Sequence, residues 1–250
     1  MEPEILTKKE LKERKKKILD IRYKGEFDTV LDEIGSFIKD LMFSDDPVAR
    51  RTIGWAMHER GVVFQNKGMN WEAGMECLQD AFAYRKAIDD PIGQAYTIFQ
   101  IPMFRLAYKE KTEDVHPDFQ RAKPYVLQAI SMLESKHLMM VATAEEKEDL
   151  GNMYQNLAYI YQQEGDDQQA MLAYKKALDF RKKIGDRRGT GITLARMAEI
   201  EEDFQKAERY LNKAYQIFDS IGDISRLKQV RETREKIGKK KLLSELEEKK

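Results

Sequence analysis

The stretch "NLAYIYQQEGDDQQAMLAYKKALDF", residues 156–180, contains two helical patterns separated by a short polar turn. In both patterns, apolar residues follow the i, i+3, i+4, i+7 spacing of one helix face. These residues are Tyr154, just upstream of the quoted stretch, with Leu157, Ala158 and Tyr161 before the turn, and Ala170, Tyr174, Ala177 and Leu178 after it. Facing alanines allow two helix backbones to approach closely, and Gly165 supplies the positive φ that often follows a helix end. The stretch therefore predicts a helical hairpin with one apolar face still to be covered.

A second copy of this pattern lies 37 residues downstream. Leu157, Ala158, Ala170, Ala177 and Ile184-Gly185-Asp186 correspond to Leu194, Ala195, Ala207, Ala214 and Ile221-Gly222-Asp223. Weaker copies precede the first, so we expect five hairpins at about residues 10–45, 48–90, 92–137, 143–185 and 188–222. Self-similarity of this kind predicts a solenoid in which each hairpin packs against its neighbours.

Two further patterns concern the start of the fourth hairpin and the C-terminal end of the chain. Thr143 and Glu146 have the spacing of a capping box, which predicts the start of a long first helix in the fourth hairpin. Residues 223–250 are expected to form a capping helix and a charged tail. The apolar stripe of this helix consists of Ile224, Leu227, Val230 and Ile237.

At the fourth hairpin the residues resemble the signature of the tetratricopeptide-repeat family. The matching positions are Tyr154, Leu157, Ala158, Tyr161, Gly165, Ala170, Tyr174 and Ala177. The connection "GDRRG" at Gly185–Gly189 is similar to the subclass found in kinesin light chains, spindle-orientation adaptors and bacterial Rap-type regulators. The resemblance covers about residues 10–222 and is weakest in the first hairpin. It implies an all-α, right-handed superhelical solenoid of about five such hairpins, closed by a C-terminal capping helix.

Composition and missing motifs narrow the function. Lys plus Arg and Asp plus Glu both number 44, so no net charge favours nucleic acid or an anionic membrane as a partner. The single cysteine, Cys77, excludes an internal disulfide framework, and we expect a cytoplasmic protein. No glycine-rich phosphate loop occurs, and the three histidines lack metal-ligand spacing. We therefore expect no enzyme, no catalytic residue, no cofactor, no metal and no small-molecule substrate.

Polar residues on the first helices of the hairpins are the candidate contacts, because these helices line the concave side of such a solenoid. In the fourth hairpin they are Asn152, Gln155, Asn156 and Tyr159. An amide both donates and accepts hydrogen bonds, so it can bind a peptide backbone without requiring one particular side chain. The resemblance implies a peptide-binding role for Asn156. The candidates elsewhere are His58, Glu59, Gln65, Tyr96, Gln100, Met103, Phe104, Arg196 and Glu199. For Tyr96, Met103 and Phe104 two interpretations stay open: an apolar pocket on that surface, or the covered faces of a central, apolar helix.

The sequence favours a non-catalytic adaptor or scaffold that binds a peptide or helical segment of a partner protein in its concave groove. Two alternatives are a structural subunit of a larger complex and a Rap-like regulator that senses a peptide. The basic segment 8–17 and the Leu242–Leu246 segment are further candidate contact sites. The sequence leaves the oligomeric state open.

Overall fold

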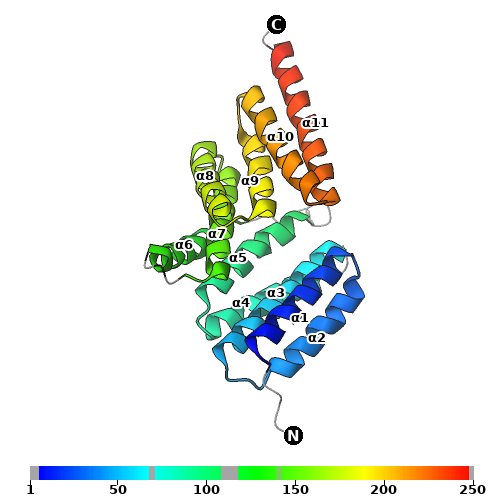
Figure 1. Ribbon diagram of the computed structural model, residues 1–250, viewed down its shortest axis with the longest axis vertical. Coiled ribbons are helices and arrows are strands. Elements are labelled where there is room, and N and C mark those ends of the chain that lie inside the picture. The colour runs from blue at the N-terminus through cyan, green and yellow to red at the C-terminus, as the bar shows by residue number, and fades with distance from the viewer. Residues whose placement is uncertain (1–5, 68–70, 108–117, 139, 141, 248–250) are drawn as a thin grey trace. The chain divides into compact units, whose positions relative to one another are not determined.

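The chain folds into α-helices. The computed structural model describes residues 6–67, 71–107, 118–138, 140 and 142–247, with the side chains of all of these except 66, 67, 107, 138, 240 and 242–247. In this part of the chain there are eleven helices and no strand (Figure 1). The all-α prediction is confirmed. The handedness of the superhelix stays a prediction.

The helices belong to two compact units, residues 1–128 and 129–250. The first unit contains α1 (Lys8–Tyr23), α2 (Phe27–Leu41), α3 (Pro47–Lys67), α4 (Trp71–Ala87), α5 (Pro91–Ala107) and the start of α6 (Lys123–Leu138). The second contains the rest of α6, α7 (Ala144–Gln163), α8 (Asp167–Lys183), α9 (Arg187–Ile200), α10 (Phe204–Ser220) and α11 (Ile224–Glu247).

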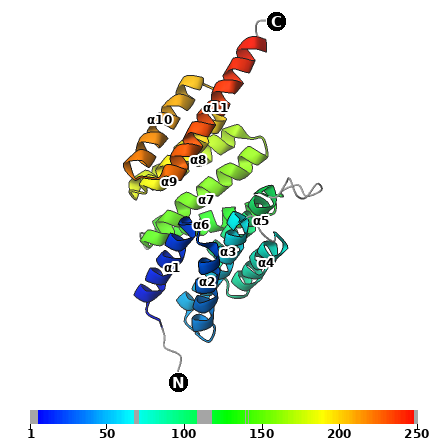
Figure 2. The same cartoon turned by 90° about the vertical axis from the view of Figure 1, so that its right-hand side faces the viewer.

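Packing within each unit follows the order of the chain. Each of the helices α1–α5 contacts the next, and so does each of the helices α7–α11 (Figures 1 and 2). The first helices of successive hairpins also meet, because α1 contacts α3 and α3 contacts α5. This is the pattern of stacked helical hairpins, in which an apolar face left open by one hairpin is covered by the next.

The α7–α8 hairpin forms as the opening stretch predicts. Ala158, Ala170 and Ala177 are completely buried, so the two helix backbones approach across small side chains. The ring of Tyr174 is equally buried, and its hydroxyl lies 3.2 Å from Oε1 of Gln162. Gly165 has φ of +79°, which confirms that the turn requires a left-handed residue.

The capping box that the sequence predicts starts α7. The backbone N–H of Glu146 donates to Oγ1 of Thr143 at 3.1 Å, and the backbone N–H of Thr143 donates to Oε2 of Glu146 at 2.9 Å. Lys136 of α6 donates to the other carboxylate oxygen of Glu146 at 2.5 Å. The same glutamate therefore caps α7 and ties it to α6.

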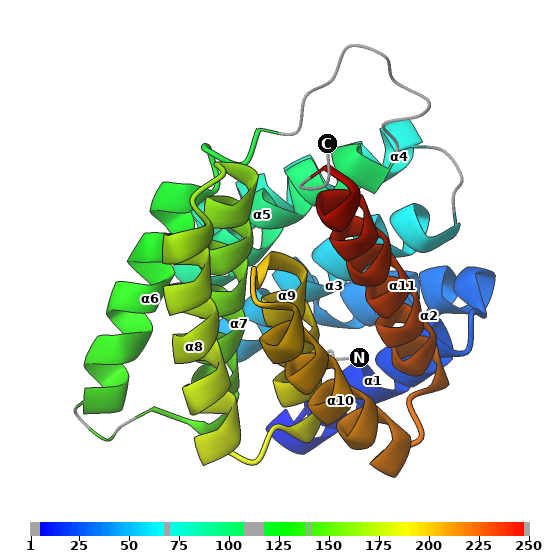
Figure 3. The same ribbon diagram turned by 90° about the horizontal axis from the view of Figure 1, so that it is seen from above.

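Helix α11 covers the last hairpin, and Figure 3 shows it beside α10. Val230 is 1% exposed, as is Phe218 of α10. One member of the expected stripe is wrong: Ile224 is 79% exposed, because it is the first residue of the helix and lies beyond the end of the covered face. The backbone of the Leu242–Leu246 segment belongs to α11, and its side chains lie outside the described residues.

Val230→Asp should destabilise the protein, because it places a carboxylate at the buried contact of α11. We expect a loss on the order of 3 kcal/mol in the free energy of unfolding, measured by urea denaturation. Ile224→Asp makes the same chemical change at an exposed position of the same helix and should have little effect. Equal losses for the two variants would contradict the assignment of α11 as a cap.

Candidate protein-binding surface

A buried arginine connects α8 to α9. Arg181, in the last turn of α8, is 2% exposed. Its Nη1 lies 2.7 Å from the carbonyl oxygen of Gly189 and 2.7 Å from Oγ1 of Thr193, both on α9. Its Nε lies 3.5 Å from Oδ2 of Asp186, which neutralises the charge. We call these four residues the Arg181 network.

The same guanidinium also contacts α7. Nη2 of Arg181 donates to Oδ1 of Asn152 at 2.6 Å, and Nη1 donates to Oε1 of Gln155 at 2.6 Å. Two of the four candidate contacts on α7 are therefore held by a charge from the next helix. Helical spacing predicts that Asn152 and Gln155 share one face of α7, but it does not predict the arginine beneath them.

Glycine is required on both sides of this arginine. The backbone N–H of Gly189 donates to Oδ1 of Asp186 at 2.7 Å, so Asp186 caps α9. A Cβ on Gly189 would overlap the Asp186 carboxylate and lie 2.7 Å from Nε of Arg181. A Cβ on Gly151 of α7 would lie 3.2 Å from Cγ of Arg181. The "GDRRG" connection therefore provides the cap and the space that the buried side chain needs.

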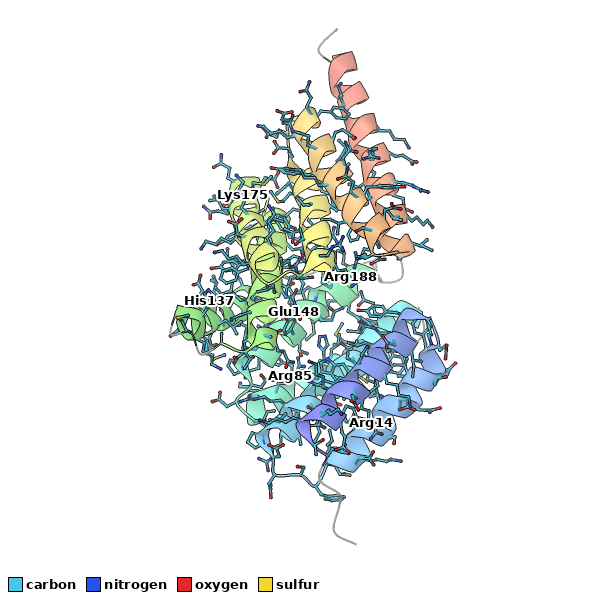
Figure 4. The ribbon with its side chains drawn as sticks, viewed as in Figure 1. Arg14, Arg85, His137, Glu148, Lys175 and Arg188 are labelled. Atoms are coloured by element: carbon cyan, nitrogen blue, oxygen red, sulfur yellow. The ribbon has the colours of Figure 1, made fainter. Side chains whose placement is uncertain are left out.

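The N-terminal unit contains an equivalent Arg85 network. Arg85, labelled in Figure 4, is 4% exposed. Its Nη1 lies 2.6 Å from both the carbonyl oxygen of Gly93 and Oγ1 of Thr97. The backbone N–H of Gly93 donates to Oδ1 of Asp90 at 3.1 Å. Arg85, Asp90, Gly93 and Thr97 have the same spacing as the members of the Arg181 network, a signal that could have revealed both from the sequence.

Gly189→Ala should destabilise the protein although alanine is the better helix former. We expect a loss of about 1–3 kcal/mol, because the methyl group must displace the cap or the buried arginine. Thermal and urea denaturation measure it.

Gly35→Ala is the matched control, because Gly35 lies inside α2 and an added Cβ meets nothing within 4 Å. This variant should gain about 0.5–1 kcal/mol. A gain at both positions would show that the space beside Arg181 is not needed.

In the N-terminal unit, two of the predicted surface contacts are buried. His58 is 9% exposed and Glu59 is 8% exposed, so neither is the open contact that the sequence argument expected. Glu59 accepts a hydrogen bond from Nη1 of Arg22 on α1, and burial raises its pKa despite that arginine and Arg85. The physical reason is that α3 packs against both α1 and α5, so that Glu59 meets Arg22 of α1 and His58 meets Thr97 of α5.

The surroundings of His58 favour its neutral form and one tautomer of it. The hydroxyl of Thr97 donates to the carbonyl oxygen of Gly93 at 3.1 Å and accepts from Arg85. Nδ1 of His58 lies 3.2 Å from the same hydroxyl oxygen, so Nδ1 must carry the proton and donate it. Burial, Arg85 and then Arg22 hold the pKa of His58 well below its usual value.

The neutral imidazole makes stability depend on pH. Below about pH 6.5 the unfolded chain binds a proton at His58 that the folded chain does not, so the free energy of unfolding falls. Between about pH 7.5 and pH 5.5 we expect the free energy of unfolding to fall by about 1 kcal/mol less in His58→Gln than in the wild type. Urea denaturation at both pH values measures this difference. Glu59 is present in both proteins, so its opposite effect largely cancels. Equal losses in the two proteins would mean that His58 binds its proton equally well in the folded and unfolded states, which would contradict the lowered pKa.

The remaining candidates of the N-terminal unit are mostly occupied. Nε2 of Gln100 donates to Oε1 of Gln65 at 2.5 Å, and Nε2 of Gln65 lies 3.4 Å from the carbonyl oxygen of Met103. Tyr96 and Met103 are partly buried. The expected apolar pocket is wrong for Phe104, which is completely buried against Met75 and Leu78 of α4, because helix α5 turns this ring toward the core.

The C-terminal unit retains accessible polar groups on α7 and α9. Asn156 and Tyr159 are partly buried, and Asn156 has no hydrogen-bond partner among the side chains that the structure describes. Arg196 donates to Glu199 at 2.9 Å, and its guanidinium lies 5.8 Å from the centre of the Tyr159 ring. We call Asn152, Gln155, Asn156 and Tyr159 the α7 face.

Beside the α7 face, an open pocket of about 220 Å³ lies between α9 and α11. Arg196 and Glu199 line it together with Arg226, Gln229 and Thr233. The capping helix thus contributes polar side chains next to the predicted contacts. The sequence predicts a covering role for this helix and a contact role only for its Leu242–Leu246 segment, so the part that lines the pocket was not among the predicted contacts.

Other kinds of site receive no support. In the part of the chain that the structure describes, no three His, Cys, Asp or Glu side chains are grouped so that they could hold a metal ion. Across the same residues, no helix has the length and apolar character needed to span a membrane.

Comparison with known proteins identifies the hairpin. Residues 151–184, which contain most of α7 and all of α8, match the tetratricopeptide repeat family. Because its helical hairpins are stacked, the protein belongs to the class of helical-repeat proteins. The chain carries a tetratricopeptide repeat and has the fold of a tetratricopeptide-repeat protein. Its assignment to the kinesin light chain subclass stays a prediction.

Two solved structures share this fold at low sequence identity. BtubC (BKLC) from P. vanneervenii is 16% identical with a TM-score of 0.54, covering 81% of this chain and 77% of that one. A signal transduction ATPase with numerous domains and a tetratricopeptide repeat sensor, from Pyrococcus horikoshii, is 15% identical with a TM-score of 0.56. That match covers 91% of this chain and 32% of the ATPase, so the chain spans about a third of its length. No protein of curated function matches the sequence.

Proposed function

We propose that this protein is a non-catalytic adaptor that holds a segment of a partner protein against the α7 face. Tetratricopeptide repeats mediate protein–protein interactions, and α7 belongs to the repeat that the family comparison identifies. Extended surfaces on the first helices of stacked hairpins suit this role. A cytoplasmic location is part of the same proposal.

The observation that carries the proposal is the state of Asn156. Its amide has no hydrogen-bond partner among the described side chains, yet the residue is partly buried between polar neighbours of the same face. Such an amide can pair with the backbone of an extended peptide, donating to a carbonyl and accepting from an N–H. The corresponding residue of the N-terminal unit, Glu59, is already paired with Arg22. The α7 face is therefore the better candidate.

Asn156→Ala should weaken partner binding and leave the fold intact. Loss of one or two hydrogen bonds, each contributing about 0.5–1.5 kcal/mol, corresponds to a dissociation constant that is about 3- to 100-fold higher. A suitable probe is a peptide of about a dozen residues, selected with the wild-type protein from a displayed random library, and isothermal titration calorimetry measures its affinity.

Two further variants complete this test. Tyr159→Ala should cost a comparable amount through lost contact area. Gln168→Ala removes an exposed amide from α8 and should leave the affinity unchanged. Wild-type affinity in both α7 variants, with melting temperatures also unchanged, would place the binding site elsewhere and contradict the proposal.

A further inference from the structure

The Arg181 guanidinium fixes which end of the Gln155 amide faces inward. A guanidinium carries five N–H donors and no acceptor. The Gln155 atom that lies 2.6 Å from Nη1 of Arg181 must therefore be the oxygen. The orientation of the amide follows from the chemistry of its neighbour.

The other end of this amide is accessible. Nε2 of Gln155 has no hydrogen-bond partner among the side chains that the structure describes. It is also absent from the fully buried polar atoms of those side chains that lack a partner. Nε2 is therefore not sealed off from solvent, and its N–H groups have no partner among those side chains. Donation from a charged group to the amide oxygen also polarises the amide, which strengthens Nε2 as a donor.

We propose that Arg181 is a positioning residue that makes Gln155 a fixed hydrogen-bond donor, so that the α7 face selects oxygen acceptors of a bound peptide. These acceptors are main-chain carbonyls or side-chain carboxylates. The inference rests on the proposed function and adds the chemistry of the group that meets Gln155. Asn156, by contrast, can turn either end of its amide toward a ligand.

The Arg85 network offers a comparison for the donor role of Gln155. It indicates that the identity of the residue at this position, and not the fold, decides whether a donor or an acceptor faces outward. His58 follows Gly54 by four residues, as Gln155 follows Gly151. There Nδ1 donates inward to Thr97, which leaves Nε2 of the ring as an acceptor. An equivalent buried arginine thus accompanies an acceptor in one unit and a donor in the other.

Gln155→Glu separates this inference from a general loss of contact. The glutamate keeps the shape of the side chain, and its carboxylate can accept from Arg181, but it has no N–H to offer a ligand. We expect an unchanged or higher melting temperature, together with an affinity at least about tenfold lower for peptides selected by the wild-type protein. Gln155→Met, which removes the amide without adding charge, should lose less affinity.

Gln168→Glu adds the same charge at an exposed position of α8 and controls for long-range repulsion, so its affinity should stay within about twofold of the wild type. Titrations with amidated peptides that contain or lack Asp and Glu distinguish the two acceptors. If the acceptor is a carbonyl, Gln155→Glu weakens both kinds of peptide. If it is a carboxylate, the loss is confined to the acidic ones and decreases with added salt.

Three results would overturn the inference. A melting temperature of Gln155→Glu well below that of Gln155→Met would mean that the oxygen does not face Arg181, and this readout needs no ligand. Wild-type affinity in Gln155→Glu, while Asn156→Ala binds weakly, would refute the donor role and leave the proposed function standing. Wild-type affinity in both variants, or a library that yields no binding peptide, would contradict the proposed function itself.

Discussion

The C-terminal unit depends on a positive charge that has been removed from water. Burying a guanidinium is costly unless its donors and its charge are satisfied. The carboxylate of Asp186 offsets the charge of Arg181, and oxygens of α7 and α9 accept hydrogen bonds from its Nη1 and Nη2. The Arg181 side chain therefore joins three consecutive helices, α7, α8 and α9.

This requirement explains much of the local sequence. The Arg181 side chain contacts an aspartate that caps the next helix and a threonine one turn further along it. Gly151 and Gly189 leave room for its aliphatic part and its guanidinium. The connection between α10 and α11 shows the arrangement without a buried arginine. Phe218 occupies the place of the arginine, Asp223 still caps the following helix through the backbone N–H of Arg226, and Arg226 replaces the glycine. Capping is thus common to the connections, whereas the glycine accompanies the buried arginine.

The network also links stability to recognition. In a stacked-hairpin protein each element contacts mainly its neighbours, so a bond between successive hairpins determines how their first helices are held. Arg181 supplies such a bond and at the same time orients Asn152 and Gln155 on the α7 face. In the N-terminal unit the equivalent residues are buried and contact other helices of the same unit. His58 contacts Thr97, and Glu59 is paired with Arg22. The two units thus share a device and differ in what they leave accessible.

The sequence by itself determined the elements and the face on which the candidate site lies. Helical spacing of Ala158, Ala170 and Ala177, the capping box at Thr143 and the turn at Gly165 are local patterns, and each depends on residues within a few positions of one another. The same periodicity placed Asn152, Gln155, Asn156 and Tyr159 together on α7. Only the tertiary structure decided that Arg181 and Arg85 are buried, that Phe104 faces the core and that Ile224 is exposed. The reason is physical: a charged side chain is buried only where partners from several helices converge on it, and that convergence depends on packing between segments distant in the chain.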